Sequence, residues 1–520
     1  MAAALLGALA VLVARSFDFA AQPEEDAAIL MRYSRHLAAG HGIVWNVGEP
    51  PVDGATDFLF MLLLAALHAG GLSLEAGVRA LDLVAHAITV VVVYAGARRL
   101  FGASLASAAV AAAFVAAGPA LAYTEACFGT PLFALTVAVA WYAAARAARD
   151  GGSGAAAAFA GSALVMGLAR PEGALLAVFM LIAVLHARGG AGSRRILAAF
   201  AAIFGGLGLT YFAWRWWYFG HPLPTPFYKK GGGALHWDTF RKSLKNVWDL
   251  TFPFLLAWPV GLAFSRTRRQ AVFSLIPVVS FAAIWVLLSD ETNYLKRFRY
   301  PIVPIVLMSW PPLVEGLRAL LPRPARRAVA VGALAVACAL LVRHQRAFAP
   351  PDRPRAGLQD MAAMLRGFGA GRYAMAVTES GLLPFYSEWR ALDAWGLNDT
   401  WIARHGGITE EYLDRYRPEV VMFHAYYSPL EPPSPRAARS GLGPGWFRMC
   451  RTLQAYAERH GYRLAAAFGR EPSHVHAYYV RPGFPESAAL EAAIRGFDYV
   501  WYQDGQRSAN FALPETETLP

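Results

Sequence analysis

The stretch EDAAILMRYSRHLAAGHGIVWNVGE at residues 25–49, continued by VDGATDFL at residues 52–59, lies between two apolar runs. Its polar composition predicts that residues 20–56 form a loop outside the bilayer. A helix is expected over residues 24–39, because apolar residues recur there at helical spacing. The apolar face would carry Ile29, Leu30, Tyr33 and Leu37, and the opposite face Arg32, Arg35 and His36. This pattern indicates an amphipathic helix at the membrane surface.

The composition around this stretch is that of a membrane protein. Of 520 residues, 56% are hydrophobic and only 16% are charged, whereas an average soluble domain is about 25% charged. The deficit is confined to residues 1–345, where apolar runs alternate with short Arg-rich or Pro/Gly-rich breaks. The run at residues 1–14 is short for a span, which needs ~20 residues. The other candidate spans are 57–72, 78–97, 103–121, 130–148, 155–170, 173–187, 196–219, 251–265, 271–289, 301–320 and 327–345.

The predicted fold is mainly α, with a polytopic transmembrane domain at residues 1–345 and an α/β domain at residues 346–520. About 11–13 membrane helices are expected, since runs of this kind satisfy their backbone groups only as helices. In the second domain, strand-like and helix-like stretches alternate. The strands are expected at 373–378 and 420–424, and the helices at 358–368 and 452–460.

The net charge of +12 comes from arginines in the breaks between apolar runs, which argues against nucleic-acid binding and for membrane orientation. The Arg clusters at 98–99, 146–149, 188–195, 266–269 and 323–327 would be cytoplasmic. The loop 220–250 and the C-terminal domain would then be external. If residues 20–56 are external as well, the segments 57–72 and 78–97 cannot both be full spans, so one would be re-entrant or the count would be wrong.

Cysteine and histidine residues give no metal signature. The three cysteines, Cys127, Cys338 and Cys450, have neither disulfide-framework nor metal-ligand spacing. His424, His474 and His476 lack spaced acidic partners, so they are interpreted as ordinary polar residues. His474 and His476 would lie on one face of a strand.

The first candidate site is acidic. Glu25 and Asp26, with Glu24, follow the first apolar run and could take a proton from an attacking hydroxyl, or hold a divalent cation against a phosphate. Alternatively they cap the following helix. Thr56 and Asp57 could likewise cap a helix, or Asp53 and Asp57 could complete an acidic site with Asp26.

Three further groups are candidates for binding a phosphate. Tyr228, Lys229 and Lys230 lie in the Gly-rich loop 221–233, which could bind a lipid phosphate and order over a ligand, or be a solvated flexible loop. Arg297 and Arg299 match phosphate oxygens in geometry, or anchor the chain at the interface. Arg170 and Glu172 form an ion pair at a helix end, or belong to the site.

Taken together, these motifs resemble the first external loop of GT-C-type membrane glycosyltransferases, above all mycobacterial-type arabinofuranosyltransferases. The similarity extends to Thr130–Phe133, Arg170–Gly173, Tyr211–Tyr228, and, in the C-terminal domain, Glu379-Ser380-Gly381 and Gly396–Asp399. The chain departs from the family at three places. The Glu before Pro-Leu-Phe is missing from Cys127–Thr130, Glu25 replaces the first Asp of the acidic pair, and Asp57 replaces an Asn or Ser.

The resemblance implies about a dozen membrane helices with an extracytoplasmic domain, in a bacterial plasma membrane. It implies an inverting glycosyltransferase that takes a sugar, first of all arabinofuranose, from a polyprenyl-phosphate donor. The acceptor would be an external glycan, lipid or protein. Asp26 is favoured as the base, with Glu25 beside it. No cofactor is certain; a divalent cation, Mg²⁺ or Mn²⁺, would be held by Asp26 if one is used.

Two other functions fit the same architecture. A non-catalytic envelope or flagellar assembly protein would tolerate replacement of Asp26. A lipid or solute transporter is disfavoured, because transporters often contain internal repeats and midplane charges, whereas here no repeat is found and the distinctive polar residues gather on one side.

Overall fold

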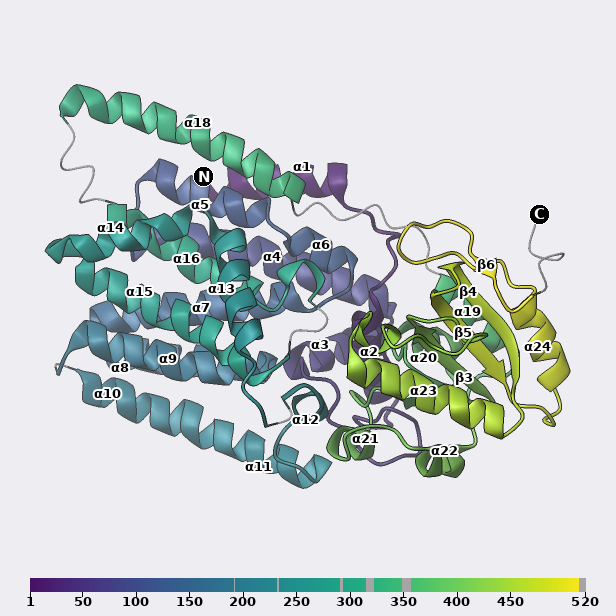
Figure 1. The fold of residues 1–520 in the computed structure, drawn as a ribbon. Coiled ribbons are helices and arrows are strands. Elements are labelled where there is room, and N and C mark those ends of the chain that lie inside the picture. The colour runs from purple at the N-terminus through teal and green to yellow at the C-terminus, as the bar shows by residue number, and fades with distance from the viewer. Residues whose placement is uncertain (191, 232, 290–292, 315–321, 348–356, 514–520) are drawn as a thin grey trace.

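The computed structural model describes residues 1–190, 192–231, 233–289, 293–314, 322–347 and 357–513. It has a helical bundle at the N-terminal end and an α/β domain at the C-terminal end (Figure 1). Among the described residues, six helical segments are long and apolar enough to cross a membrane. These are α4 (Leu74–Arg99), α5 and α6 (Leu105–Glu125), α7 (Thr130–Asp150), α9 (Pro171–Arg188), α10 to α11 (Ser193–Phe219) and α15 with η3 (Ser265–Leu287).

Shorter apolar helices complete the bundle. They are α1 (Ala2–Ser16), α3 (Phe58–Ala69), α8 (Ser153–Ala169), the pair η2 (Phe254–Leu256) and α14 (Ala257–Ala263), and the apolar part of α18 (Arg323–Ala347). Small side chains let the helices approach closely. Ala138 and Ala144 of α7 and Ala156 and Ala160 of α8 are all buried, and the two helices pack together. The chain is therefore a multi-pass membrane protein, with helices in most of the predicted apolar runs.

Three predicted spans need correction. The run 57–72 forms α3, a helix of only 12 residues. The run 301–320 is broken into η5 (Tyr300–Ile302), α16 (Val303–Ser309) and η6 (Pro311–Val314), and residues 315–320 lie outside the described part. The run 251–265 is divided between η2 and α14. Proline lacks the N–H of a helical hydrogen bond, and it recurs in the last two runs at 253, 259, 301, 304, 311 and 312.

The short helix α3 removes the difficulty with the number of crossings. Its first end follows Asp57, which pairs with Arg170 at the start of α9. Its other end leads to Glu75 of α4, which accepts a hydrogen bond of 2.9 Å from Tyr386 of the C-terminal domain. A helix of 12 residues rises only about 18 Å, less than the ~30 Å of the hydrocarbon core, so α3 is not expected to cross.

The expected loop 220–250 is largely helical. It contains α12 (Thr225–Gly231) and α13 (Trp237–Thr251). Buried residues of α13 recur at helical spacing, at Thr239, Ser243, Val247 and Leu250. The chain between Gly231 and Trp237 includes position 232, which lies outside the described residues.

The C-terminal domain is a six-stranded mixed sheet among the described residues, in the order β2-β1-β3-β5-β4-β6. The strands are β1 (Ala374–Val377), β2 (Arg390–Asp393), β3 (Val420–Ala425), β4 (Arg463–Glu471), β5 (His474–Val480) and β6 (Ala509–Asn510). The predicted strands and the helix at 358–368 are confirmed, whereas the helix expected at 452–460 begins earlier, at Pro444.

Both faces of the sheet are covered by helices. Val420 and Met422 of β3 point into the core shared with α19 (Gly357–Gly367), α20 (Leu382–Ser387) and α24 (Ser487–Arg495). Val421 and Phe423 point into a second core with α22 (Glu410–Tyr416) and α23 (Pro444–Arg459). This alternation follows from the period of two along a strand. The shorter elements of this domain are α21 (Thr400–Arg404) and η7 (Ala437–Arg439). The short η4 (Tyr294–Lys296) lies outside it and precedes η5 in the chain.

Helix α2 (Glu25–Ala38) lies between the bundle and the sheet domain (Figure 1). Its Arg32 is 2% exposed. The guanidinium donates to the backbone oxygens of Pro384 and Trp389, and to Asn46 Oδ1 at 3.0 Å. The predicted surface-lying helix is therefore wrong. The cationic face binds carbonyl groups of the C-terminal domain, so α2 joins the two domains.

Candidate functional site

Two cavities adjoin at the N-terminal end of α2. The larger has a volume of about 790 Å³ and the smaller about 200 Å³. Much of the wall of the larger cavity consists of apolar side chains from α8, α9, η1 (Phe200–Leu207) and α11 (Gly208–Phe219). The smaller cavity lies against the C-terminal domain and is lined by Glu379, His424 and Trp395. Both cavities are lined by Asp26, Ile29, Phe128, Lys230, Arg297 and Leu397.

Asp26 lies where the cavities meet. Its Oδ2 accepts a hydrogen bond of 2.6 Å from Arg297 Nη2. Glu25 also lines the smaller cavity, and its carboxylate accepts from the backbone N–H groups of Gly381 and Leu382. Glu24 occupies the position before α2 but makes no side-chain cap. The two acids of the predicted pair thus have different contacts, and both lie in the first turn of α2, where acidic residues favour a helix N-terminus.

Acidic groups of intermediate exposure cluster around Glu25. Burial raises the pKa of Glu25, and the nearby Glu379 raises it further. Burial also raises the pKa of Glu379, with the negative charges of Asp26 and Glu24 adding to the effect. Glu25 and Glu379 therefore bind a proton more readily than free carboxyl groups do, and their surroundings favour a hydroxyl group or a cation over an anion.

Asp57, Thr56, Arg170 and Glu172 all line the larger cavity. Arg170 pairs with Asp57 and with Glu172, the latter at 3.1 Å. Asp57 stands at the start of α3 but makes no side-chain cap there. The ion pair predicted for Arg170 and Glu172 is present, and it lies in the wall of the cavity.

Asp53 does not join this acidic group. It is buried, pairs with Arg215 of α11, and lines neither cavity among the described residues. Its backbone oxygen accepts from Thr225 N at 2.9 Å. Asp53 therefore fastens the first loop to α11 and α12.

The residues of α12 have different positions. Lys230 lines both cavities. The Lys229 Nζ lies 3.8 Å from the centre of the Trp395 ring, and Tyr228 lies beneath the Arg404 guanidinium at 5.9 Å. Neither Tyr228 nor Lys229 lines either of these two cavities. Helix α12 is thus held against α21, with one lysine directed to the site.

Arg297 and Arg299 also differ. The Arg297 guanidinium lies 3.8 Å from the centre of the Phe128 ring, in both cavity walls. Arg299 is fully buried, lies over Trp285 at 4.3 Å, and donates to Ser243 Oγ at 3.2 Å. The phosphate contact predicted for Arg299 is not supported by this geometry, because Arg299 lines neither cavity.

Sequence reasoning missed Glu379 and His424 as cavity residues. Among the described residues, Glu379, His424 and His476 have ligand atoms within 4.8 Å of one another, a spacing that could hold a metal ion. Asp26, which the sequence suggested as the ligand if a metal is used, is not in this group. Glu379-Ser380-Gly381 stood out as a motif, but nothing along the chain brings it to the histidines, which are 45 or more residues away.

Comparison with known proteins gives two partial matches in sequence. Residues 352–485 match a family described as a domain of unknown function, DUF8728. A terminal β-(1→2)-arabinofuranosyltransferase of Mycobacterium tuberculosis is 28% identical over 278 residues, which cover 49% of this chain and 43% of that protein. The chain thus spans less than half the length of this curated relative.

Two solved structures match over most of the chain. ArnT from Cupriavidus metallidurans, crystallised with undecaprenyl phosphate, is 14% identical with a TM-score of 0.52, covering 92% of this chain and 97% of ArnT. The oligosaccharyltransferase AglB from Archaeoglobus fulgidus, in complex with an inhibitory peptide and a dolichol-phosphate, is 11% identical with a TM-score of 0.53, covering 92% and 74%. The chain has the GT-C fold. The fold expected from the sequence is confirmed.

Proposed function

We propose that this protein is an inverting glycosyltransferase that moves a sugar from a polyprenyl-phosphate donor to an extracytoplasmic acceptor. The observation that carries the proposal is the meeting of the two cavities at Asp26. Arabinofuranose is the first sugar to test, because the M. tuberculosis relative is an arabinofuranosyltransferase. The acceptor would be a glycan, a lipid or a protein.

The larger cavity suits a lipid phosphate. Its walls are mainly apolar and come from helices that face the bilayer, such as α11, whose Leu209 is exposed. Its polar end carries Lys230 and Arg297. A prenyl chain would be stabilised along the apolar wall, and the phosphate at the cationic end. ArnT and AglB, which share the fold, were solved with undecaprenyl phosphate and dolichol-phosphate.

The proposed reaction gives a role to Asp26, Arg297 and Lys230. An acceptor hydroxyl in the smaller cavity attacks the anomeric carbon, and Asp26 takes the hydroxyl proton. The bond from the anomeric carbon to the phosphate oxygen breaks, and the lipid phosphate leaves with the electron pair. Arg297 and Lys230 stabilise its added negative charge. Arg297 also holds the Asp26 carboxylate in place at 2.6 Å.

The test is transfer by the full-length protein in lipid nanodiscs, with polyprenyl-phosphate arabinofuranose as donor and a panel of acceptors. We expect Asp26→Asn to lower kcat by about 100-fold or more, since general-base catalysis contributes 10²–10⁴-fold. Donor binding should be retained, because the lipid contacts lie elsewhere in the cavity. Asp18→Asn is the matched control: Asp18 is an exposed carboxylate between α1 and α2 and lines neither cavity.

Equal activity of Asp26→Asn and the native protein would remove Asp26 as the base. If several lipid-phosphate sugars neither bind nor react, a non-catalytic role in envelope assembly becomes the better explanation. If only donors that carry a sugar other than arabinofuranose react, the protein is still a glycosyltransferase, but its substrate is that other sugar.

A further inference from the structure

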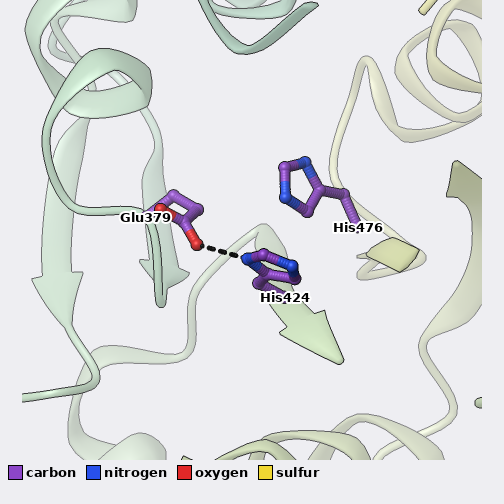
Figure 2. A group of neighbouring side chains, drawn as sticks. All are labelled: Glu379, His424 and His476. Carbon is purple, nitrogen blue, oxygen red and sulfur yellow. Dashed lines mark hydrogen bonds and ion pairs between the residues drawn. The ribbon is translucent and has the colours of Figure 1, made fainter. Parts of the chain in front are cut away.

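A histidine and carboxylate cluster lies on the face of the sheet that is turned toward α2. His424 of β3 and His476 of β5 are directly opposed in the antiparallel register. Glu379 follows the end of β1, the strand that pairs with β3 on its other side. Figure 2 shows the three side chains pointing toward one another, with a contact between Glu379 and His424. Glu379 Oε1 lies 3.0 Å from His424 Nδ1.

The cluster has one unsatisfied ring nitrogen. His476 is 1% exposed, and its Nδ1 lies 2.6 Å from the hydroxyl of Tyr499. Its Nε2 has no hydrogen-bond partner among the described residues. A buried polar atom without a partner costs free energy, so native structures nearly always provide one. This nitrogen therefore points to a ligand between the three side chains.

We propose that Glu379, His424 and His476 bind a divalent transition-metal ion, and that Zn²⁺ is the metal this set of two imidazoles and one carboxylate fits. Tetrahedral zinc with ligands at 2.0–2.1 Å places neighbouring ligand atoms about 3.3 Å apart. The 3.0 Å between Glu379 Oε1 and His424 Nδ1 is close to that spacing. All three ligand atoms lie within 4.8 Å of one another, so small side-chain rotations complete the site.

The surroundings resemble those of metal-bound histidines. His424 is 5% exposed and His476 1% exposed, so both rings are shielded from solvent. Ligating histidines usually donate the other ring N–H to an oxygen, and Tyr499 is placed to accept it from His476. His474, whose Nε2 is 2.8 Å from His424 Nε2, lies next to the site.

The ion would act on the position of Glu25. Glu379 is two residues before Gly381, whose backbone N–H donates to Glu25. Glu379 and His424 also line the smaller cavity beside Asp26. A metal ion joining the ends of β1, β3 and β5 would therefore fix the segment that holds the start of α2. This role is structural and does not depend on the sugar that is transferred.

Metal content provides the test. Full-length protein in detergent would be incubated with ZnCl₂, freed of unbound metal by gel filtration, and measured by inductively coupled plasma mass spectrometry. We expect about one zinc per chain for the native protein, and at least about tenfold less for His476→Ala and Glu379→Gln. The matched control is His405→Ala, an exposed histidine of the same domain, which should retain the metal.

A second measurement uses only the native protein, so it remains informative if the variants fail to fold. Native protein loaded with Co²⁺ should show the strong visible absorption of a tetrahedral site, and added Zn²⁺ should abolish it. The proposal is overturned if folded native protein binds no metal. It is also overturned if His476→Ala and His405→Ala retain the same amount. Neither readout uses sugar transfer, so this result and the test of Asp26 stand apart.

Discussion

Side chains that are only a few residues apart in the sequence make very different contacts at the site. Arg297 reaches Asp26 and both cavities, whereas Arg299 is buried against Trp285. Asp57 pairs with Arg170 in the cavity wall, whereas Asp53 pairs with Arg215 outside it. Chemistry at this site is therefore set by single residues, not by the charge of a loop as a whole.

Lys229 and Lys230 allow this distinction to be measured. Lys230→Ala should raise KM for the lipid-phosphate donor by roughly 10- to 100-fold, because a hydrogen bond to a charged group contributes about 1.5–3 kcal/mol. Lys229→Ala removes a contact with Trp395, for which about 1 kcal/mol or less is expected. Steady-state kinetics in nanodiscs would compare the two variants. Equal effects of both would contradict the assignment of Lys230 alone to the cavity.

At the scale of elements, the position of Glu25 and Asp26 depends on the contact between α2 and α20. Glu25 accepts from the first residues of α20, and Arg35 lies 4.6 Å from the centre of the Phe385 ring. Gly381 makes the close approach possible. A Cβ at this position would lie 1.7 Å from the Glu25 carbonyl oxygen, which no side chain can tolerate.

Gly381→Ala should therefore push α20 away from α2. We expect a loss of about 1–3 kcal/mol in the free energy of unfolding, as for other overpacked sites, together with loss of transfer activity. Gly407→Ala is the matched control in the same domain, because its Cβ would meet nothing within 4 Å. Thermal unfolding followed by tryptophan fluorescence would check both variants. A melting temperature unchanged by Gly381→Ala would show that the contact is looser than described.

At the scale of the whole molecule, the cavities open between two domains that the first loop joins. Trp45 Nε1 donates to Ala391 O at 2.8 Å, and Asn46 contacts the same strand. The larger cavity belongs mainly to the bundle and the smaller one mainly to the sheet domain. A substrate in both would thus contact lipid-facing helices and the C-terminal domain at once.

The distribution of arginines predicts that the C-terminal domain is external. A reporter that needs an oxidising compartment, such as alkaline phosphatase, should be active when fused to the C-terminus. A green fluorescent protein folded in the cytoplasm should fluoresce when fused after Arg195, in a cluster expected to be cytoplasmic. The reverse pattern of the two reporters would invert the proposed orientation and place transfer in the cytoplasm.

The sequence by itself determined the membrane domain, most of its helices, the C-terminal α/β domain and the acidic residues of the first loop. Apolar run length and helical or strand spacing depend on neighbours along the chain, so they can be read without a structure. Local reading went wrong where prolines interrupt the run 301–320, and where α2, with its buried Arg32, looked like a helix on a membrane surface.

Only the tertiary structure decided which charges meet. Asp26 and Arg297 are 271 residues apart, and Glu25 and Gly381 are 356 apart. His424 and His476 face each other because of the register of β3 and β5. A shift of one residue would move one of the two side chains to the opposite face of the sheet. Packing between domains fixes such pairs, and no local pattern encodes it. The candidate residues were therefore available from the sequence, but their arrangement around Asp26 was not.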